Sequence, residues 1–355
     1  HCILRRTAAG FVQECCVGPM ERDEAAKSGL RVKTWNEFDA LKIHKEAKDP
    51  VEADVRILTK VFETLGISGT VAFYGTGDIP GSYMLLDALS RESGIEVRAE
   101  AHNSLFSEAR MTKSDEEIDR MIEINDKAQE VMQVVWEFLS ACSDKGGKIV
   151  DSDGEGVTIG RVKKLIAEET RARGMLLEEE VIFSQGRDSA VPHSRGDDSA
   201  ILVPGKTIVF DYCPQGAGGG YFADITRTVV SGEPKPEHVK IYNIVKEAQE
   251  RAINAVKPGV TAESIDATAR NIIEESGYGE YFIHRTGHGL GLEVHEEPYI
   301  RAGNKMVLKE GMAFTVEPGI YLPGKFGVRI EDDIVVTKDG FEDLTKLSKS
   351  LTDIS

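Results

Sequence analysis

The chain has no excess of positive charge and no long apolar run. Its 355 residues contain 43 Lys and Arg against 60 Asp and Glu, which gives a net charge of −17 at pH 7. Nucleic acids and anionic membranes attract basic proteins, so this charge argues against both as partners. No apolar segment approaches the roughly 18 residues of a transmembrane helix, and the first residues lack the pattern of a signal peptide.

Cysteines are few, and their spacing matches neither a metal-binding motif nor a redox motif. There are five of them: Cys2, Cys15, Cys16, Cys142 and Cys213. An odd, scattered set is typical of a reducing compartment, and we expect a cytoplasmic protein. Cys213 follows Asp211 by two residues. It is either a sensitive thiol or a small buried side chain, and the second interpretation is favoured.

The composition is that of an ordinary globular protein long enough for two domains, with 41% hydrophobic and 29% charged residues. Residues 1–112 alternate short strand-like segments with segments of helical spacing, which predicts a smaller α/β domain. Ser114 and Glu117 form a capping box, so a helix of about 28 residues is expected to begin near Asp115. Residues 113–355 would then form the second domain.

Within residues 113–355, an order of two helices followed by a strand hairpin occurs twice, with almost no residue identity between the copies. The first hairpin is predicted to pair strands at 207–212 and 221–230. The second pair of helices is predicted at 236–256 and 262–275. Helices and antiparallel strands together indicate an α+β domain.

Five residues in this region are of the types that bind metal ions, and each lies in or beside a predicted apolar strand. The strings are VFDY, FADITRTVV, HRTGHGLG, FTVEPGIY and VRIEDDIVV, which contain Asp211, Asp224, His288, Glu317 and Glu331. An unpaired carboxylate in an apolar core is costly. Four carboxylates and one imidazole exceed the needs of a single zinc site. They suit two divalent cations that share bridging carboxylates.

Four of these strings, in order, are DITRT, GHGLGLEVHE, VEPGIY and VRIEDD. They resemble the pita-bread metallopeptidases, a family that includes methionine aminopeptidase, aminopeptidase P, prolidase and creatinase. The resemblance implies an α+β pita-bread catalytic domain, preceded by a smaller α/β domain like that of creatinase. It implies that Asp211 binds one ion, that Asp224 and Glu331 bridge two, and that His288 and Glu317 complete the second. The ligands suit Mn²⁺ or Co²⁺, with Zn²⁺ and Fe²⁺ as alternatives.

The resemblance also implies a mechanism and a substrate side. A hydroxide bridging both metals would attack the peptide carbonyl, Glu317 would carry its proton, and His193 and His295 would assist. Substrate contacts are implied for His284, Tyr321 and Arg329, although Arg329 could instead form a buried ion pair. His295 follows His288 by seven residues, so a bend or bulge is needed for both side chains to reach one site.

The retained ligand positions favour a peptidase over creatinase or a non-catalytic binding module, and the N-terminal domain disfavours methionine aminopeptidase. Prolidases often carry Arg four residues after the position of His295, where this chain has Tyr299, with Arg301 as a possible substitute. We therefore expect an aminopeptidase P that removes the first residue from peptides with Pro in second position. Xaa-Pro dipeptidase (prolidase) is the alternative. The resemblance also implies a homodimer.

Overall fold

The computed structural model describes residues 2–8, 10–100, 104–178 and 180–352. The chain divides into two compact units, His1–Ser104 and Leu105–Ser355. The sequence places the limit of the N-terminal domain at residue 112. In the structure the helix α5 (Leu105–Met111) belongs to the second unit, where it packs against β14 (Glu296–Ile300).

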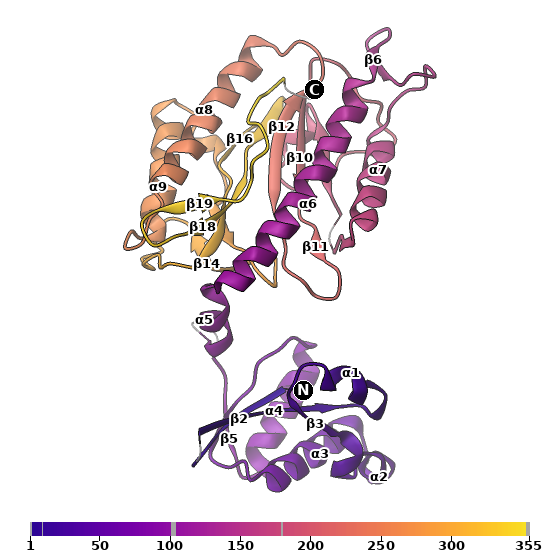
Figure 1. The fold of residues 1–355 in the computed structure, drawn as a ribbon, viewed down its shortest axis with the longest axis vertical. Helices are drawn as coiled ribbons and strands as arrows, with labels where there is room; N and C mark the ends of the chain where they lie inside the picture. Colours follow the sequence, from indigo (N-terminus) through magenta and orange to yellow (C-terminus); the bar gives the residue numbers. More distant parts are fainter. Residues whose placement is uncertain (1, 9, 101–103, 179, 353–355) are drawn as a thin grey trace. The chain divides into compact units, whose positions relative to one another are not determined.

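The first unit contains two small sheets and the helices that pack on them (Figure 1). One sheet has the order β1-β2-β3, and the other is the parallel pair β4 and β5. The strands are β1 (Cys2–Thr7), β2 (Gly10–Val17), β3 (Arg31–Thr34), β4 (Thr70–Ala72) and β5 (Glu96–Arg98). The helices are η1 (Pro19–Glu21), α1 (Arg22–Ala26), η2 (Trp35–Phe38), α2 (Ala40–Glu46), α3 (Pro50–Leu65) and α4 (Ile79–Glu92). The smaller α/β domain is thus confirmed.

Helix α3 shows how the sequence determines these elements. The Asp49 side chain accepts a hydrogen bond from the Glu52 amide at 2.9 Å, and Pro50 occupies the first turn. Gly66 ends the helix in the left-handed conformation, with φ of 66°. The apolar stripe is buried in the core of this unit through Val55, Val61, Phe62 and Leu65.

The second unit begins with two helices and a three-stranded sheet of order β12-β10-β9. Helix α6 (Asp115–Ser140) starts at the capping box of Ser114 and Glu117, as predicted, and packs on α7 (Ile159–Ala172). The sheet consists of β9 (Ile182–Gln185), β10 (Thr207–Tyr212) and β12 (Ile225–Val230). Shorter elements surround it: β6 (Ser143–Asp144), β7 (Ile149–Val150), β8 (Met175–Leu176), η3 (Asp188–Ala190) and β11 (Gln215–Gly216).

The same order then recurs with a larger sheet. Helices α8 (Pro236–Asn254) and α9 (Ala262–Glu275) pack on each other and are followed by η4 (Gly279–Tyr281). A five-stranded sheet has the order β14-β13-β15-β18-β19, and a hairpin pairs β16 with β17. These strands are β13 (Gly287–Gly289), β15 (Ala313–Val316), β16 (Gly319–Leu322), β17 (Phe326–Arg329), β18 (Asp332–Val336) and β19 (Phe341–Asp343). Figure 1 shows α8 and α9 on one side of the strands and α6 and α7 on the other.

The two halves of the second unit meet along their strands. Thr226 on β12 forms an isolated antiparallel bridge with Glu331, between β17 and β18. Each half also has its own apolar core, one centred on α6 and α7 and one on α8 and α9. The residues with metal-binding side chains therefore lie where two separately packed halves join.

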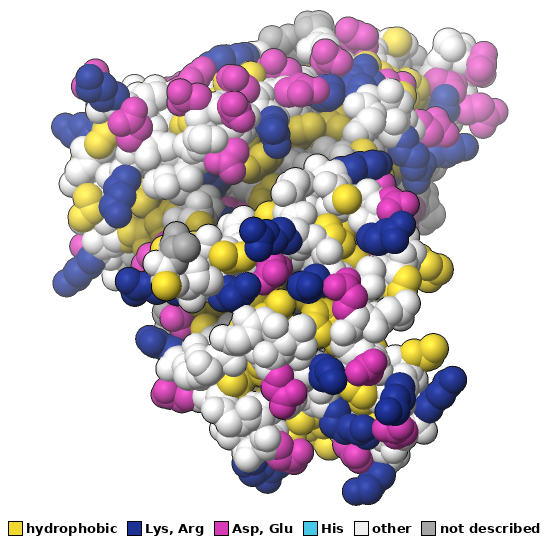
Figure 2. Space-filling model, turned by 60° about the horizontal axis from the view of Figure 1, so that its bottom comes forward, with side chains coloured by type: hydrophobic (Ala, Val, Ile, Leu, Met, Phe, Trp, Pro, Cys, Tyr) yellow, Lys and Arg dark blue, Asp and Glu magenta, His cyan; other side chains and the backbone are white. Residues whose placement is uncertain are grey.

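Among the residues that the structure describes, no helix has the length and apolar character needed to cross a membrane. Figure 2 shows acidic and basic side chains interspersed over the face that it presents.

Candidate metal centre

The five predicted metal-binding residues come together at strand ends from both halves of the second unit. Asp211 lies near the end of β10, and Asp224 immediately precedes β12. His288 is in the middle of β13, and Glu317 directly follows β15. Glu331 immediately precedes β18.

Short distances join these side chains across the seam. His288 Nε2 lies 3.6 Å from Asp224 Oδ2 and 3.5 Å from Glu317 Oε1. Asp224, His288 and Glu331 each offer a donor atom within 4.8 Å of the others, and Asp211 and Asp224 do the same with Cys213. Donor atoms at this spacing can share one or two cations.

The carboxylates of this cluster lack enough positive charge from the protein itself. Burial, and then the negative charge of Asp211, raises the pKa of Asp224 far above that of an ordinary aspartate. Burial, and then Asp224, does the same for Glu331. Burial raises the pKa of Glu317 to about 7, although the positive charge of Arg329 opposes this rise. Uncompensated buried carboxylates of this kind fit divalent cations.

His288 presents a lone pair to these carboxylates. Its Nδ1 lies 3.2 Å from the carbonyl oxygen of Gly289, which can only accept, so Nδ1 carries the proton. Burial, and then the nearby His295, lowers its pKa well below the usual value, so the ring is neutral. The unprotonated Nε2 then faces two carboxylate oxygens. Nitrogen and oxygen atoms placed in this way can together ligate a cation that lies between them.

A chain of hydrogen bonds leads from the cluster to His284. Arg329 Nη2 donates to Asp211 Oδ2 at 2.5 Å, and Arg329 Nη1 donates to the Tyr321 hydroxyl at 2.7 Å. The Tyr321 hydroxyl lies 2.9 Å from His284 Nε2. Burial, followed by the positive charge of Arg329, lowers the pKa of His284 to about 3, so this ring is neutral. Arg329 thus forms a buried ion pair with one of the predicted metal-binding carboxylates, and its contact with substrate stays a prediction.

His295 reaches the cluster through the expected irregularity. The pairing of β13 with β14 shifts register between Gly287 and Gly289, and the rings of His288 and His295 lie 4.3 Å apart. A Cβ on Gly287 would collide with the carbonyl oxygen of Thr315, so only glycine lets β13 approach β15 here. His193 is exposed, and its positive charge would lie close enough to help lower the pKa of His284.

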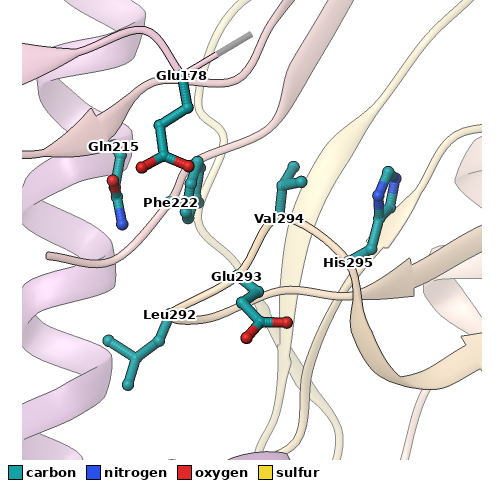
Figure 3. Close-up of a pocket in the computed structure, with 7 residues that line it drawn as sticks. All are labelled: Glu178, Gln215, Phe222, Leu292, Glu293, Val294 and His295. Carbon is teal, nitrogen blue, oxygen red and sulfur yellow. The ribbon is translucent and has the colours of Figure 1, made fainter. Parts of the chain in front are cut away.

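A pocket of about 320 Å³ opens beside His295. Figure 3 shows its wall, with Glu178 and Gln215 on one side and the segment 292–295 on the other. Arg110 pairs with Glu293 at 2.7 Å, whereas Phe222 supplies apolar surface.

A second buried charge cluster, which the sequence did not predict, lies directly behind the first. Arg227 donates to Asp332 Oδ1 at 2.8 Å, Gln249 donates to Asp332 Oδ2 at 2.6 Å, and Lys349 pairs with the same oxygen. Burial alone would raise the pKa of Asp332, but Arg227 and Lys349 outweigh burial and lower it. The only sequence signal was a second acidic residue beside Glu331, since these partners are far apart along the chain.

The comparisons with known proteins agree with this geometry. Residues 95–338 match the model of metallopeptidase family M24. The chain belongs to this family.

Members of the M24 family resemble the chain over most of its length. The Xaa-Pro dipeptidase of Pyrococcus furiosus is 38% identical over 83% of this chain and 77% of its own length. The structure of an Xaa-Pro dipeptidase from Bacillus anthracis superimposes with a TM-score of 0.79 at 30% identity, over 99% of this chain and 89% of that one. The structure of an X-Pro aminopeptidase from Thermotoga maritima superimposes with a TM-score of 0.77 at 31% identity, over 96% of this chain and 87% of that one.

The M24 match confirms the predicted pita-bread fold and the predicted metallopeptidase activity. Between the two activities considered, the curated relatives favour the dipeptidase alternative, and the aminopeptidase P prediction is not confirmed. The cluster contains carboxylate and imidazole groups that can hold a metal ion. The roles of its individual residues remain predictions.

Cys213 has an unexpected place in this M24 centre. Its thiol donates to Asp224 Oδ1 at 2.9 Å and lies 3.6 Å from Asp211 Oδ1. Burial, and then Asp224, raises the pKa of the thiol well above its usual value. The side chain is therefore a protonated donor to the carboxylates, in addition to filling space.

Proposed function

We propose that the chain is an Xaa-Pro dipeptidase that uses two divalent cations, Mn²⁺ or Co²⁺ by preference and Zn²⁺ or Fe²⁺ as alternatives. The observation that supports it most is the cluster of Asp211, Asp224, His288, Glu317 and Glu331, in which carboxylates outnumber nearby protein cations. The substrate class is that of the similar Xaa-Pro dipeptidase from Pyrococcus furiosus.

In this proposal each ligand has a stated place. Asp211 would hold one ion, Asp224 and Glu331 would be shared by the two, and His288 and Glu317 would hold the second. When bound, the ions supply Lewis-acid charge for the scissile carbonyl and for the attacking water. The shortage of protein cations around these carboxylates supports the assignment.

The chain's own groups then manage protons and orientation. Glu317 lies beside His288 in the cluster, and its carboxylate can take a proton from water and return it to the leaving nitrogen. His295, beside His288, donates a hydrogen bond to the carbonyl oxygen as negative charge develops. His193 assists the leaving group. Arg329 orients Asp211, while Tyr321 and His284 extend that hydrogen-bond chain toward the substrate.

The test is a hydrolysis assay of the Mn²⁺-loaded and Co²⁺-loaded protein with an Xaa-Pro dipeptide and the matching Xaa-Pro-Xaa tripeptide. We expect metal-dependent cleavage with a clear dipeptide preference. Asp224→Asn should lose both metal binding and turnover. Asp153→Asn is the matched control, because Asp153 is exposed in a turn and has no place in the cluster.

A second candidate, aminopeptidase P, is supported by the similarity to the Thermotoga maritima X-Pro aminopeptidase. It predicts the opposite substrate order, with the tripeptide cleaved faster. Absence of metal-dependent cleavage of either peptide would contradict both candidates. The homodimer and the cytoplasmic location stay predictions.

A further inference from the structure

A dipeptide with Pro in second position carries a free carboxylate one residue beyond the bond to be cut. Recognition of that group in a partly buried site needs a cation with free donors. Three arginines lie on the strands and loops that surround the candidate centre: Arg285, Arg301 and Arg329. Their contacts differ, and the difference identifies one of them.

Arg329 has its donors occupied. Besides its bonds to Asp211 and Tyr321, its Nε donates to Thr226 Oγ1 at 3.2 Å and its Nη1 to the Pro192 carbonyl at 3.3 Å. Its side chain is 3% exposed and pairs with a proposed metal-binding carboxylate. Turning it toward a substrate would leave the Asp211 carboxylate without its partner, so Arg329 is a positioning residue.

Arg301 is exposed and lies outside β14, in the turn that follows it. Its Nη1 donates to the carbonyl of the adjacent Ala302 at 3.4 Å. An exposed guanidinium is well solvated and gains little from binding a carboxylate. It serves as the control for the argument below.

Arg285 is half-buried, and its guanidinium has neither a hydrogen bond nor an ion pair with any part of the chain that the structure describes. Instead, its guanidinium carbon lies 4.7 Å from the ring centroid of Tyr299. This contact occupies one face of the planar group and leaves the N–H donors at its edge free.

Arg285 also lies next to the catalytic side of the site. Its neighbour His284 ends the chain of bonds from Arg329, and the carbonyl of its other neighbour, Thr286, accepts from the Glu317 amide at 2.7 Å. Its positive charge acts on the pKa values of both Glu317 and His288. It opposes the rise that burial causes in the pKa of Glu317, and it adds to the fall that burial causes in the pKa of His288. A cation with free donors therefore stands beside the proposed proton carrier.

We propose that Arg285, held in place by stacking on Tyr299, binds a carboxylate of the peptide substrate. This inference rests on the proposed dipeptidase function and names one of its specificity residues. The carboxylate is either the C-terminus of the dipeptide or an acidic side chain on its first residue. The position where a prolidase Arg was expected holds Tyr299, and in this chain that ring supports an arginine from another strand end.

The experiment compares wild type, Arg285→Gln and Arg301→Gln, all loaded with Mn²⁺, on two substrate pairs. The first pair is an Ala-Pro dipeptide and its C-terminal amide. The second is a Glu-Pro and a Gln-Pro dipeptide. A charge-assisted hydrogen bond contributes about 1.5–3 kcal/mol, or roughly a 10- to 100-fold change. We expect Arg285→Gln to raise KM by that factor for the member of one pair that carries the extra carboxylate, while its neutral partner changes little.

The substrate pair whose two members Arg285→Gln no longer distinguishes identifies which carboxylate Arg285 binds. Arg285→Lys should restore part of the preference, and Tyr299→Leu should weaken it by a smaller factor, since stacking only orients the guanidinium. Melting temperatures of all variants separate these effects from loss of fold.

Two results would overturn the inference alone. One is a wild type that cleaves dipeptides while Arg285→Gln keeps both substrate ratios unchanged. The other is loss of discrimination in Arg301→Gln instead. A wild type that cleaves no Xaa-Pro dipeptide, with bound metal shown by elemental analysis, overturns the proposed function and with it the inference.

Discussion

Glu331 and Asp332 are neighbours in sequence and both are buried, but the side chains around them carry opposite charges. Glu331 faces Asp224, His288 and Glu317, and its pKa is raised well above the usual value by burial and then by Asp224. Asp332 has a lowered pKa, because Arg227 and Lys349 outweigh its burial. Consecutive residues on a strand point to opposite faces, so one carboxylate reaches each cluster.

The comparison separates charges that the protein neutralises itself from charges that it leaves for an external cation. Behind the seam, the protein supplies Arg227, Lys349 and the Gln249 amide to Asp332. In front of it, Arg329 pairs with Asp211, while the other carboxylates crowd one another. Divalent ions should bind and stabilise a cluster whose buried carboxylates lack protein cations. Metal binding is therefore linked to the stability of the fold.

The largest expected effect comes from Glu331→Gln, which changes only the cluster of predicted metal ligands. Loss of a bridging carboxylate should lower kcat/KM by at least about 10³-fold. The metal-free protein should keep its free energy of unfolding within about 1 kcal/mol, because burial and the charge of Asp224 raise the pKa of Glu331 and so favour its neutral form, of which glutamine is a close analogue. Steady-state kinetics and urea unfolding in EDTA measure the two. A large loss of stability without metal would contradict the comparison.

Arg227→Met breaks the second cluster, the one around Asp332, and its main effect should be on the stability of the fold. Arg227 donates to Asp332 and to the carbonyls of Thr226, Glu331, Leu347 and Ser348. Removing one partner of a buried ion pair costs about 3–5 kcal/mol. Urea unfolding of the metal-free protein should show that loss. As a matched control, Arg161→Met removes a more exposed pair with Asp151 and should cost under about 1 kcal/mol.

A smaller, pH-dependent effect concerns Glu317, whose pKa of about 7 in the folded state exceeds its ordinary value of 4.5. Between these pH values the folded state holds more protons than the unfolded state, so the free energy of unfolding falls as pH rises. Relative to Glu317→Gln, the metal-free wild type should lose roughly 2–3 kcal/mol from pH 5 to pH 8. Chemical unfolding in EDTA at several pH values measures this difference. A difference that is constant with pH contradicts the assignment, and Mn²⁺ should remove the slope.

The elements with strong local signals were predictable from sequence. Helix α9 occupies residues 262–275 as predicted, because the apolar spacing defines it even though Thr261 makes no side-chain capping bond, and β10 occupies 207–212 as predicted. The return strand β12 begins at Ile225 and not at Tyr221, because Phe222 pairs with Gln215 in an isolated bridge before the regular ladder starts. Neither the hairpin of β1 and β2 nor α2 was predicted, since these segments mix charged and apolar residues without a clean period.

The candidate site was predictable as a set of residues but not as a set of contacts. The ordered strings identify the five candidate ligands that the structure brings to one seam. The seven-residue spacing of His288 and His295 indicated the irregularity that brings these two rings together. The pairing of Arg227 with Asp332 joins residues 105 positions apart, and the stacking of Arg285 on Tyr299 depends on the register of β13 and β14. Such contacts follow from the assembled sheet, which one sequence does not reveal.

The buried cluster around Asp332 makes the seam depend on a segment outside both sheets. Asp332 obtains one of its cations from Lys349, Arg227 binds the carbonyls of Leu347 and Ser348, and the Val230 amide donates to the Leu351 carbonyl. Residues 347–351 therefore fasten β12 to β18 like a clasp. Because each half packs its own apolar core, removal of this segment should loosen the seam before it loosens either half.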